Sequence, residues 1–193
     1  LYTGNGSTNA ITSVGLQPDW TWIKNRGDTH AHVLVDAVRG VTKELRSSGN
    51  NAEITTSNSF TSFDSDGFTL GADSTDSYNK NSNNYVSWNW KANGAGSSNT
   101  DGSITSTVSA NTTSGFSIVK YTGTGSAATI GHGLGVAPKM IIAKNLGDAR
   151  SWGVYHASLG ATQPIDLDGT GAAFSSSTYW NNTSPTTSVF STG

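Results

Sequence analysis

The chain has 193 residues, enough to bury a sizeable core, with a formal net charge of −2 and only 12% charged residues. This balance lacks the clustered basic face that binding to nucleic acid or to anionic membranes requires. The chain has no cysteine, which excludes disulfides, thiolate metal sites and cysteine catalysis. It has no apolar run of membrane-spanning length and no charged-then-apolar leader, so we expect neither a membrane span nor a signal peptide.

The first half of the chain is rich in short strand patterns. Gly, Ser, Thr and Asn are abundant while helix formers are sparse, which favours strands and turns. Five segments are predicted to be strands: 19–24, 32–37, 42–46, 67–70 and 85–90. Between residues 36 and 45 a helical turn competes with a hairpin. Gly40 and the β-branched Val41 and Thr42 weaken the helix, so we favour the hairpin.

One internal boundary stands out. Residues 92–103 have the Gly, Ser and Asn composition of a flexible connection. They divide the chain into a first β repeat at 1–91, the linker at 92–103, and a second β repeat at 104–193. Three strands are predicted in the second repeat, at 116–121, 139–144 and 152–157.

The two halves carry the same residue types in the same order. Tyr2-Thr3-Gly4 returns as Tyr121-Thr122-Gly123, and Phe68-Thr69-Leu70-Gly71 returns as Phe190-Ser191-Thr192-Gly193. The offset changes only from 119 residues, between Tyr2 and Tyr121, to 122 residues, between Phe68 and Phe190. We interpret this pattern as a duplication with small changes in loop length.

Each half lacks one strand that the other has. The first half continues past Gly71 to the predicted strand 85–90, which has no counterpart in the second half. The second half opens with the predicted strand 116–121, where the first half has only Leu1 before its Tyr-Thr-Gly. Unpaired strand edges favour strand addition, so we expect the other half or another subunit to fill them.

Two Asp-rich turns resemble the start of a calcium loop. Asp64 and Asp66 precede Gly67, and Asp166 and Asp168 precede Gly169. Neither turn carries the distal Glu that completes such a loop, so ordinary turn chemistry is favoured and calcium at Asp64 and Asp66 is the weaker alternative.

The histidines give little support for a second kind of metal site. His30 and His32 would share a strand face, yet no third ligand follows at a recognisable spacing. We therefore favour satisfied or exposed histidines.

The sequence gives little support for an enzyme. No Gly-x-Ser-x-Gly elbow is present. A glycosidase would need two acids facing each other across a cleft. The acids that could pair in this way are Asp19, Asp36, Glu44, Glu53 and Asp64.

The tryptophans are the residues most suited to binding a sugar, because a flat ring covers a pyranose face. We expect Trp88, Trp90 and at least one of Trp20 and Trp22 to be buried in the core. Trp180 lies among Ser, Thr and Asn residues, which predicts a loop. An exposed sugar-binding ring there, with Tyr179 and Asn181 as neighbouring ligand contacts, competes with local or interface packing of the ring, and the packing is favoured.

The N-glycosylation pattern Asn-x-Ser/Thr occurs at several sites. In a chain so rich in Asn, Ser and Thr, chance matches are expected. The matching residues are Asn5, Asn111, Asn181 and Asn182.

Several of these segments together resemble a known family. They are Tyr2-Thr3-Gly4-Asn5-Gly6-Ser7, Val38-Arg39-Gly40, the stretch from Ser62 to Gly71, Val136–Ile141 and Tyr155–Gly160. In this order they resemble the repeated β-sandwich domain of tail-fibre and virion-associated proteins of aquatic phages. The resemblance covers nearly the whole chain and implies a jelly-roll or lectin-like sandwich without an agreed catalytic motif.

We therefore expect an all-β, jelly-roll or lectin-like sandwich built from two tandem repeats, with an edge strand that another copy or subunit can supply. The expected function is a non-enzymatic extracellular module of a tail fibre or virion surface protein that self-associates and attaches to a host glycan. No cofactor is expected, apart from the calcium alternative. One alternative is a filament subunit completed by strands exchanged between protomers, and the weakest is a polysaccharide-degrading enzyme.

Overall fold

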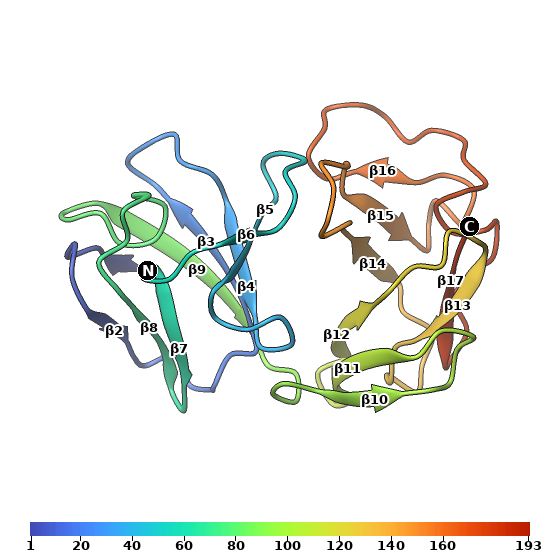
Figure 1. Ribbon diagram of the computed structural model, residues 1–193, viewed down its shortest axis with the longest axis horizontal. Coiled ribbons are helices and arrows are strands. Elements are labelled where there is room, and N and C mark those ends of the chain that lie inside the picture. The colour runs from blue at the N-terminus through green and yellow to red at the C-terminus, as the bar shows by residue number, and fades with distance from the viewer.

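The computed structural model describes residues 1–193 and contains strands and turns without any helix. The expected all-β class is confirmed. No helix is available to cross a membrane. Figure 1 shows two groups of strands side by side, one from the first half of the chain and one from the second.

The first half forms two antiparallel sheets that face each other as in a β-sandwich. The six-stranded sheet has the order β1 (Tyr2–Thr3), β9 (Asn84–Trp90), β3 (Trp20–Asn25), β4 (Val33–Asp36), β5 (Lys43–Arg46), β6 (Ile54–Thr55). The three-stranded sheet has the order β2 (Asn9–Ile11), β8 (Gly67–Leu70), β7 (Phe60–Asp64). Ile23 and Tyr85 from one sheet meet Phe60, Phe68 and Leu70 from the other in a single buried cluster.

The second half has smaller sheets. One contains β10 (Ser97–Asn99), β11 (Ser106–Asn111) and β12 (Phe116–Tyr121), and another contains β14 (Met140–Ala143), β15 (Gly153–His156) and β16 (Ile165–Asp166). The third pairs β13 (Ala128–Gly131) with β17 (Val189–Thr192). Their core consists of Ile130, Tyr155, Ala161, Trp180 and Phe190.

All eight strands predicted from the sequence are present, with ends shifted by no more than one residue. The hairpin favoured for residues 36–45 is confirmed, since β4 and β5 pair antiparallel across a turn in which Gly40 has φ +97°. That positive φ suits glycine because it lacks a Cβ atom.

The expected flexible linker is partly ordered. Its residues Ser97–Asn99 form β10, which pairs with β11 in register. Ser and Asn side chains do not reveal such a strand, because its backbone pairing with β11 and not its own apolar pattern holds it in place.

The two halves pack against each other through a third cluster. Leu34 and Leu45 on the outer face of the six-stranded sheet meet Trp152 of the second half. The Trp152 indole nitrogen donates hydrogen bonds to the carbonyl oxygens of Arg46, at 3.1 Å, and Gly49, at 3.0 Å. This packing positions β12 and β14 beside the outer face of the first half.

Candidate functional site

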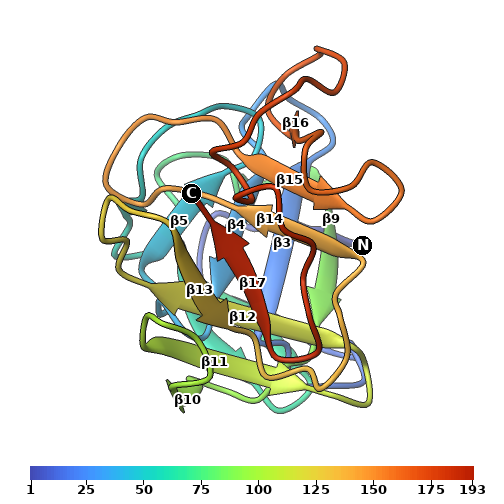
Figure 2. The same ribbon diagram turned by 90° about the vertical axis from the view of Figure 1, so that its right-hand side faces the viewer.

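The candidate site consists of two strand edges in the second half, those of β12 and β14, that no further strand pairs. In the first half, β9 lies between β1 and β3 and pairs antiparallel with both. By the sequence correspondence interpreted above as a duplication, Tyr121 at the end of β12 aligns with Tyr2, and β14 aligns with β3. The strands β12 and β14 belong to different sheets and no strand joins them. Figure 2 shows β12 and β14 apart from each other, behind the β13–β17 pair.

The edge of β14 that points away from β15 carries backbone groups without a partner strand. Ala157 N–H donates to the Lys139 carbonyl, and Ile141 lies opposite Tyr155 in the β14–β15 pair. Backbone groups alternate between the two edges of a strand, so the N–H and C=O groups of Met140 and Ile142 point away from β15. We refer to this unpaired edge of β14 together with the unpaired edge of β12, which is the last strand of its own sheet, as the β12–β14 slot.

The two halves differ in how deeply side chains at equivalent positions are buried. In β3, which β9 flanks in the same sheet, Thr21 and Ile23 are fully buried. Their counterparts in β14, Ile141 and Ala143, are only half-buried, although both pack against the second core. Met140 is 52% exposed. The second half is therefore open to solvent where the first half is closed.

Aromatic side chains from the first half lie beside the slot. Phe116 at the start of β12 packs on Trp20 and Trp90, with ring centroids 5.7 and 6.1 Å away. Ile142 of β14 contacts the cluster that includes Trp20 and Trp22. Because β12 and β14 each touch this face, we refer to the tryptophans of β3 and β9 as the tryptophan wall.

The expectation that Trp88 is buried is wrong, and so is the expectation for Trp20, Trp22 and Trp90. Trp88 is 47% exposed, and the other three are half-buried. The alternation predicted along β3 and β9 is present. The side they occupy is the outer face of the sheet, whereas Ile23 and Tyr85 take the inner one.

A family model described as a domain of unknown function, DUF7483, matches residues 1–193. The chain belongs to the DUF7483 family. No curated protein and no solved structure matches it. Family membership carries no activity with it, so the tail-fibre setting suggested by the sequence stays a proposal.

Trp180 lies in the predicted loop, where Thr178 and Asn181 are exposed, but the interpretation of its ring as an exposed binding surface is wrong. Its ring is 2% exposed and packs edge-on against Tyr155, with centroids 6.0 Å apart. A sugar cannot stack on a ring that the core covers. Tyr179 is half-buried and donates a hydrogen bond to Asp166 at 3.3 Å, while Asn181 is exposed with φ 48°. Burial, with Asp166 adding to it, raises the pKa of Tyr179.

The calcium candidates form part of a tight turn between β7 and β8. The Asp66 carboxylate accepts hydrogen bonds from the backbone N–H groups of Ser13, at 3.0 Å, and Gly15, at 2.6 Å. Asp64 accepts one from the Thr69 hydroxyl at 2.6 Å. No group of three or more His, Asp or Glu side chains is placed to hold a metal ion. Calcium at this turn stays a prediction.

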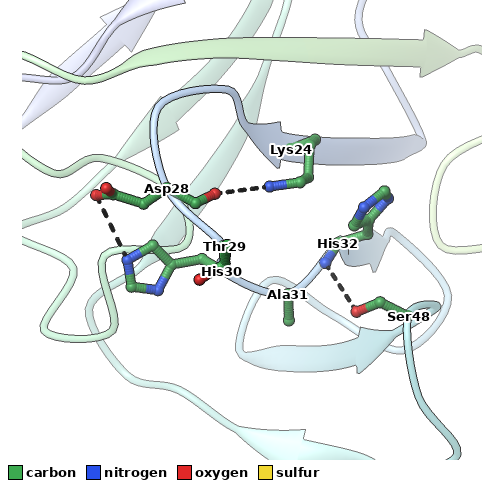
Figure 3. Close-up of a pocket in the computed structure, with 7 residues that line it drawn as sticks. All are labelled: Lys24, Asp28, Thr29, His30, Ala31, His32 and Ser48. Atoms are coloured by element: carbon green, nitrogen blue, oxygen red, sulfur yellow. Dashed lines mark hydrogen bonds and ion pairs between the residues drawn. The ribbon is translucent and has the colours of Figure 1, made fainter.

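The two histidines of the first half line an open pocket of about 550 Å³ together with Lys24, Asp28 and Ser48. In Figure 3 the His30 ring turns toward Asp28, 3.8 Å away, and the His32 ring points elsewhere. The Lys24 ammonium group donates to the carbonyl oxygens of Asn25 and Asp28. Burial and the neighbouring Lys24 lower the pKa of His32. The pocket's polar groups thus bind one another and hold the loop after β3.

The glycosylation candidates differ in how free their side chains are. The amide of Asn5 bonds to Ser7, Thr8 and Asn79, and that of Asn111 accepts from Thr113 and Ser114. The remaining two, Asn181 and Asn182, are exposed. Modification at any of the four stays a prediction.

Proposed function

We propose that the chain is a non-enzymatic structural module of an extracellular assembly, such as a phage tail fibre or virion surface protein, and that strand addition at its open edges joins it to its neighbours. The unpaired edges of β12 and β14 carry the proposal. Exposed strand edges with free N–H and C=O groups pair readily with another strand. The resemblance of Ser62–Gly71 to tail-fibre domains supports the extracellular setting.

The acids named as catalytic candidates support a structural role. Asp36 and Glu53 both bind the Arg39 guanidinium, at 2.5 and 3.1 Å. Glu44 is fully buried and accepts a hydrogen bond from the Tyr78 hydroxyl at 2.7 Å. Carboxylates held in this way stabilise loops and strands, so a polysaccharide-degrading enzyme is the weakest alternative.

Amide hydrogen exchange tests whether the edge of β14 is unpaired. We expect the amides of Met140 and Ile142 to exchange fast in the isolated chain, and those of their counterparts Trp20 and Trp22 to exchange slowly, because β9 covers only the latter pair. Protected amides at Met140 and Ile142 in a monomeric sample would contradict the proposal. The mass of the chain, measured by light scattering, establishes that the sample is monomeric.

The alternative assembly is a filament in which copies of the folded chain join edge to edge. A head-to-tail contact that does not close produces such a filament. Light scattering over a range of concentrations, followed by electron microscopy, distinguishes this filament from a module that stays monomeric until a separate strand binds. Growth into filaments with newly protected β14 amides supports the filament.

A second candidate function, attachment to a host glycan, is favoured by the exposed ring of Trp88. This ring lies 5.9 Å from that of Trp22, and together they offer aromatic surface to a pyranose face. We expect any hit on a glycan array to be lost in Trp88→Ala and kept in Trp180→Phe. Equal binding by the wild type and Trp88→Ala would exclude this surface.

A further inference from the structure

We propose that the β12–β14 slot accepts one extended polypeptide segment with the residue pattern of Asn84–Trp90. The inference rests on the proposed function and names the partner that the open edges take. The segment would join β10-β11-β12 to β14-β15-β16 in one continuous sheet, as β9 joins β1 to β3 in the first half.

The first half gives the register. Tyr2 lies opposite Tyr85 in the β1–β9 pair, while Trp20 and Trp22 lie opposite Trp90 and Trp88. Transferred to the second half, the tyrosine of the incoming strand lies opposite Tyr121. Its two tryptophans then lie opposite Met140 and Ile142, whose N–H and C=O groups point into the slot. The incoming strand runs antiparallel to both neighbours.

The two faces of the slot require different side chains. In the first half, Tyr85 is fully buried and stacks on Tyr2, with ring centroids 5.1 Å apart and planes 8° from parallel. An incoming tyrosine has the same partner in Tyr121, which packs against the second core. The opposite face of the incoming strand meets the tryptophan wall. There its apolar side chains, equivalent to Val86 and Trp88 of β9, cover the exposed Trp88 ring of the folded chain.

The occupant is a separate strand and not a second folded copy. A strand in the slot must pair on both edges, with β12 and with β14. In a folded copy, β9 already pairs with β3 along its whole length. Only a segment with both edges free satisfies the unpaired groups of β12 and β14 together.

A synthetic peptide with the sequence of residues 72–91 is the probe. We expect one peptide to bind per chain and to slow exchange of the Met140 and Ile142 amides by at least about tenfold, because each gains a partner. The peptide carrying Val86→Pro loses an N–H group that β9 directs at β3, and proline also disfavours the extended pairing. We expect it to bind at least about tenfold more weakly.

A protein variant checks the place of binding. Met140→Pro removes a donor that points away from β15, at a position that is 52% exposed and lies outside the clusters that join the halves. We expect it to weaken binding about tenfold while circular dichroism stays that of the wild type. The wild-type exchange experiment needs no variant, so a misfolded variant does not leave the proposal untested.

Some outcomes would overturn the inference. They are an absence of binding at millimolar peptide, equal binding by the Val86→Pro peptide, or protection of the Met140 and Ile142 amides by self-association without peptide. The proposed function fails separately, when these amides are protected in the free monomer. Fast exchange of these amides without peptide binding therefore contradicts the proposed occupant and leaves the proposed function standing.

Discussion

At residue 180, a tryptophan surrounded by Ser, Thr and Asn lies in the second core, where it contacts Tyr155. Truncation of a buried tryptophan leaves a large cavity. We expect Trp180→Ala to lower the free energy of unfolding by about 3–5 kcal/mol, measured by urea denaturation. Trp88→Ala, at a ring that is 47% exposed, is the control, with an expected loss below about 1 kcal/mol. Equal losses would contradict the burial difference.

His132 is a buried residue whose stability contribution depends on pH. It is 2% exposed, and its Nδ1 accepts from the Leu134 N–H at 3.2 Å, which leaves Nε2 to donate to the Thr186 carbonyl. Burial lowers the pKa of His132 below 6.5, although Thr186 and Asp101 act in the opposite direction.

The sign of the pH effect at His132 follows from that depressed pKa. The unfolded chain takes up the proton at higher pH than the folded chain does. The stabilisation is therefore present above about pH 6.5 and lost as the pH falls through the folded pKa. We expect wild-type unfolding free energy to decline over this range more steeply than that of His132→Asn. Parallel pH profiles of the two proteins would contradict the assignment.

At the scale of elements, the same loop follows β3 and β14. Asn25 accepts hydrogen bonds from the N–H groups of Gly27 and Asp28, and Asn145 accepts them from Gly147 and Asp148. In both loops a lysine, Lys24 or Lys144, donates to two backbone carbonyls. These shared contacts support the duplication interpretation and explain why the Lys-Asn-x-Gly-Asp segment returns.

The connection from β8 to β9 depends on one buried acid. The Asp73 carboxylate accepts hydrogen bonds from the backbone N–H groups of Thr75, Tyr78 and Asn79. In Asp73→Ala the buried amides of Tyr78 and Asn79 lose their partner. We expect a loss of about 3 kcal/mol or more in thermal or urea unfolding. Asp76→Ala, whose side chain is 41% exposed, should cost less than about 1 kcal/mol. Similar losses in the two variants would show that the hydrogen bonds to the Asp73 carboxylate contribute little to stability.

At the scale of the molecule, the halves are joined by the packing of Trp152 and by backbone contacts such as Glu53 N–H to the Leu146 carbonyl. We expect Trp152→Ala to cost about 3–5 kcal/mol and to increase the radius of gyration measured by small-angle X-ray scattering, because the halves separate. Leu159→Ala at an exposed position is the control. An unchanged radius together with wild-type stability would show that other contacts hold the halves together.

Prediction from sequence succeeded where strands alternate large apolar and polar side chains, as in β3, β9 and β12. It missed strands such as β6 and β10, which are short or polar and are held by pairing with a neighbour. It also read the tryptophan stripe correctly but assigned it to the core. Alternation identifies the two faces of a strand without saying which face a second layer will cover.

The sequence by itself determined the all-β class and the order of the main strands. These properties follow from local alternation and turn residues. Only the tertiary structure decided that Trp180 is buried, that Trp88 is exposed, and that β12 and β14 belong to separate sheets beside the tryptophans of β3 and β9. Those properties depend on how distant sheets pack, because burial is set by the neighbours that the fold brings together and not by the residue's own surroundings in the chain.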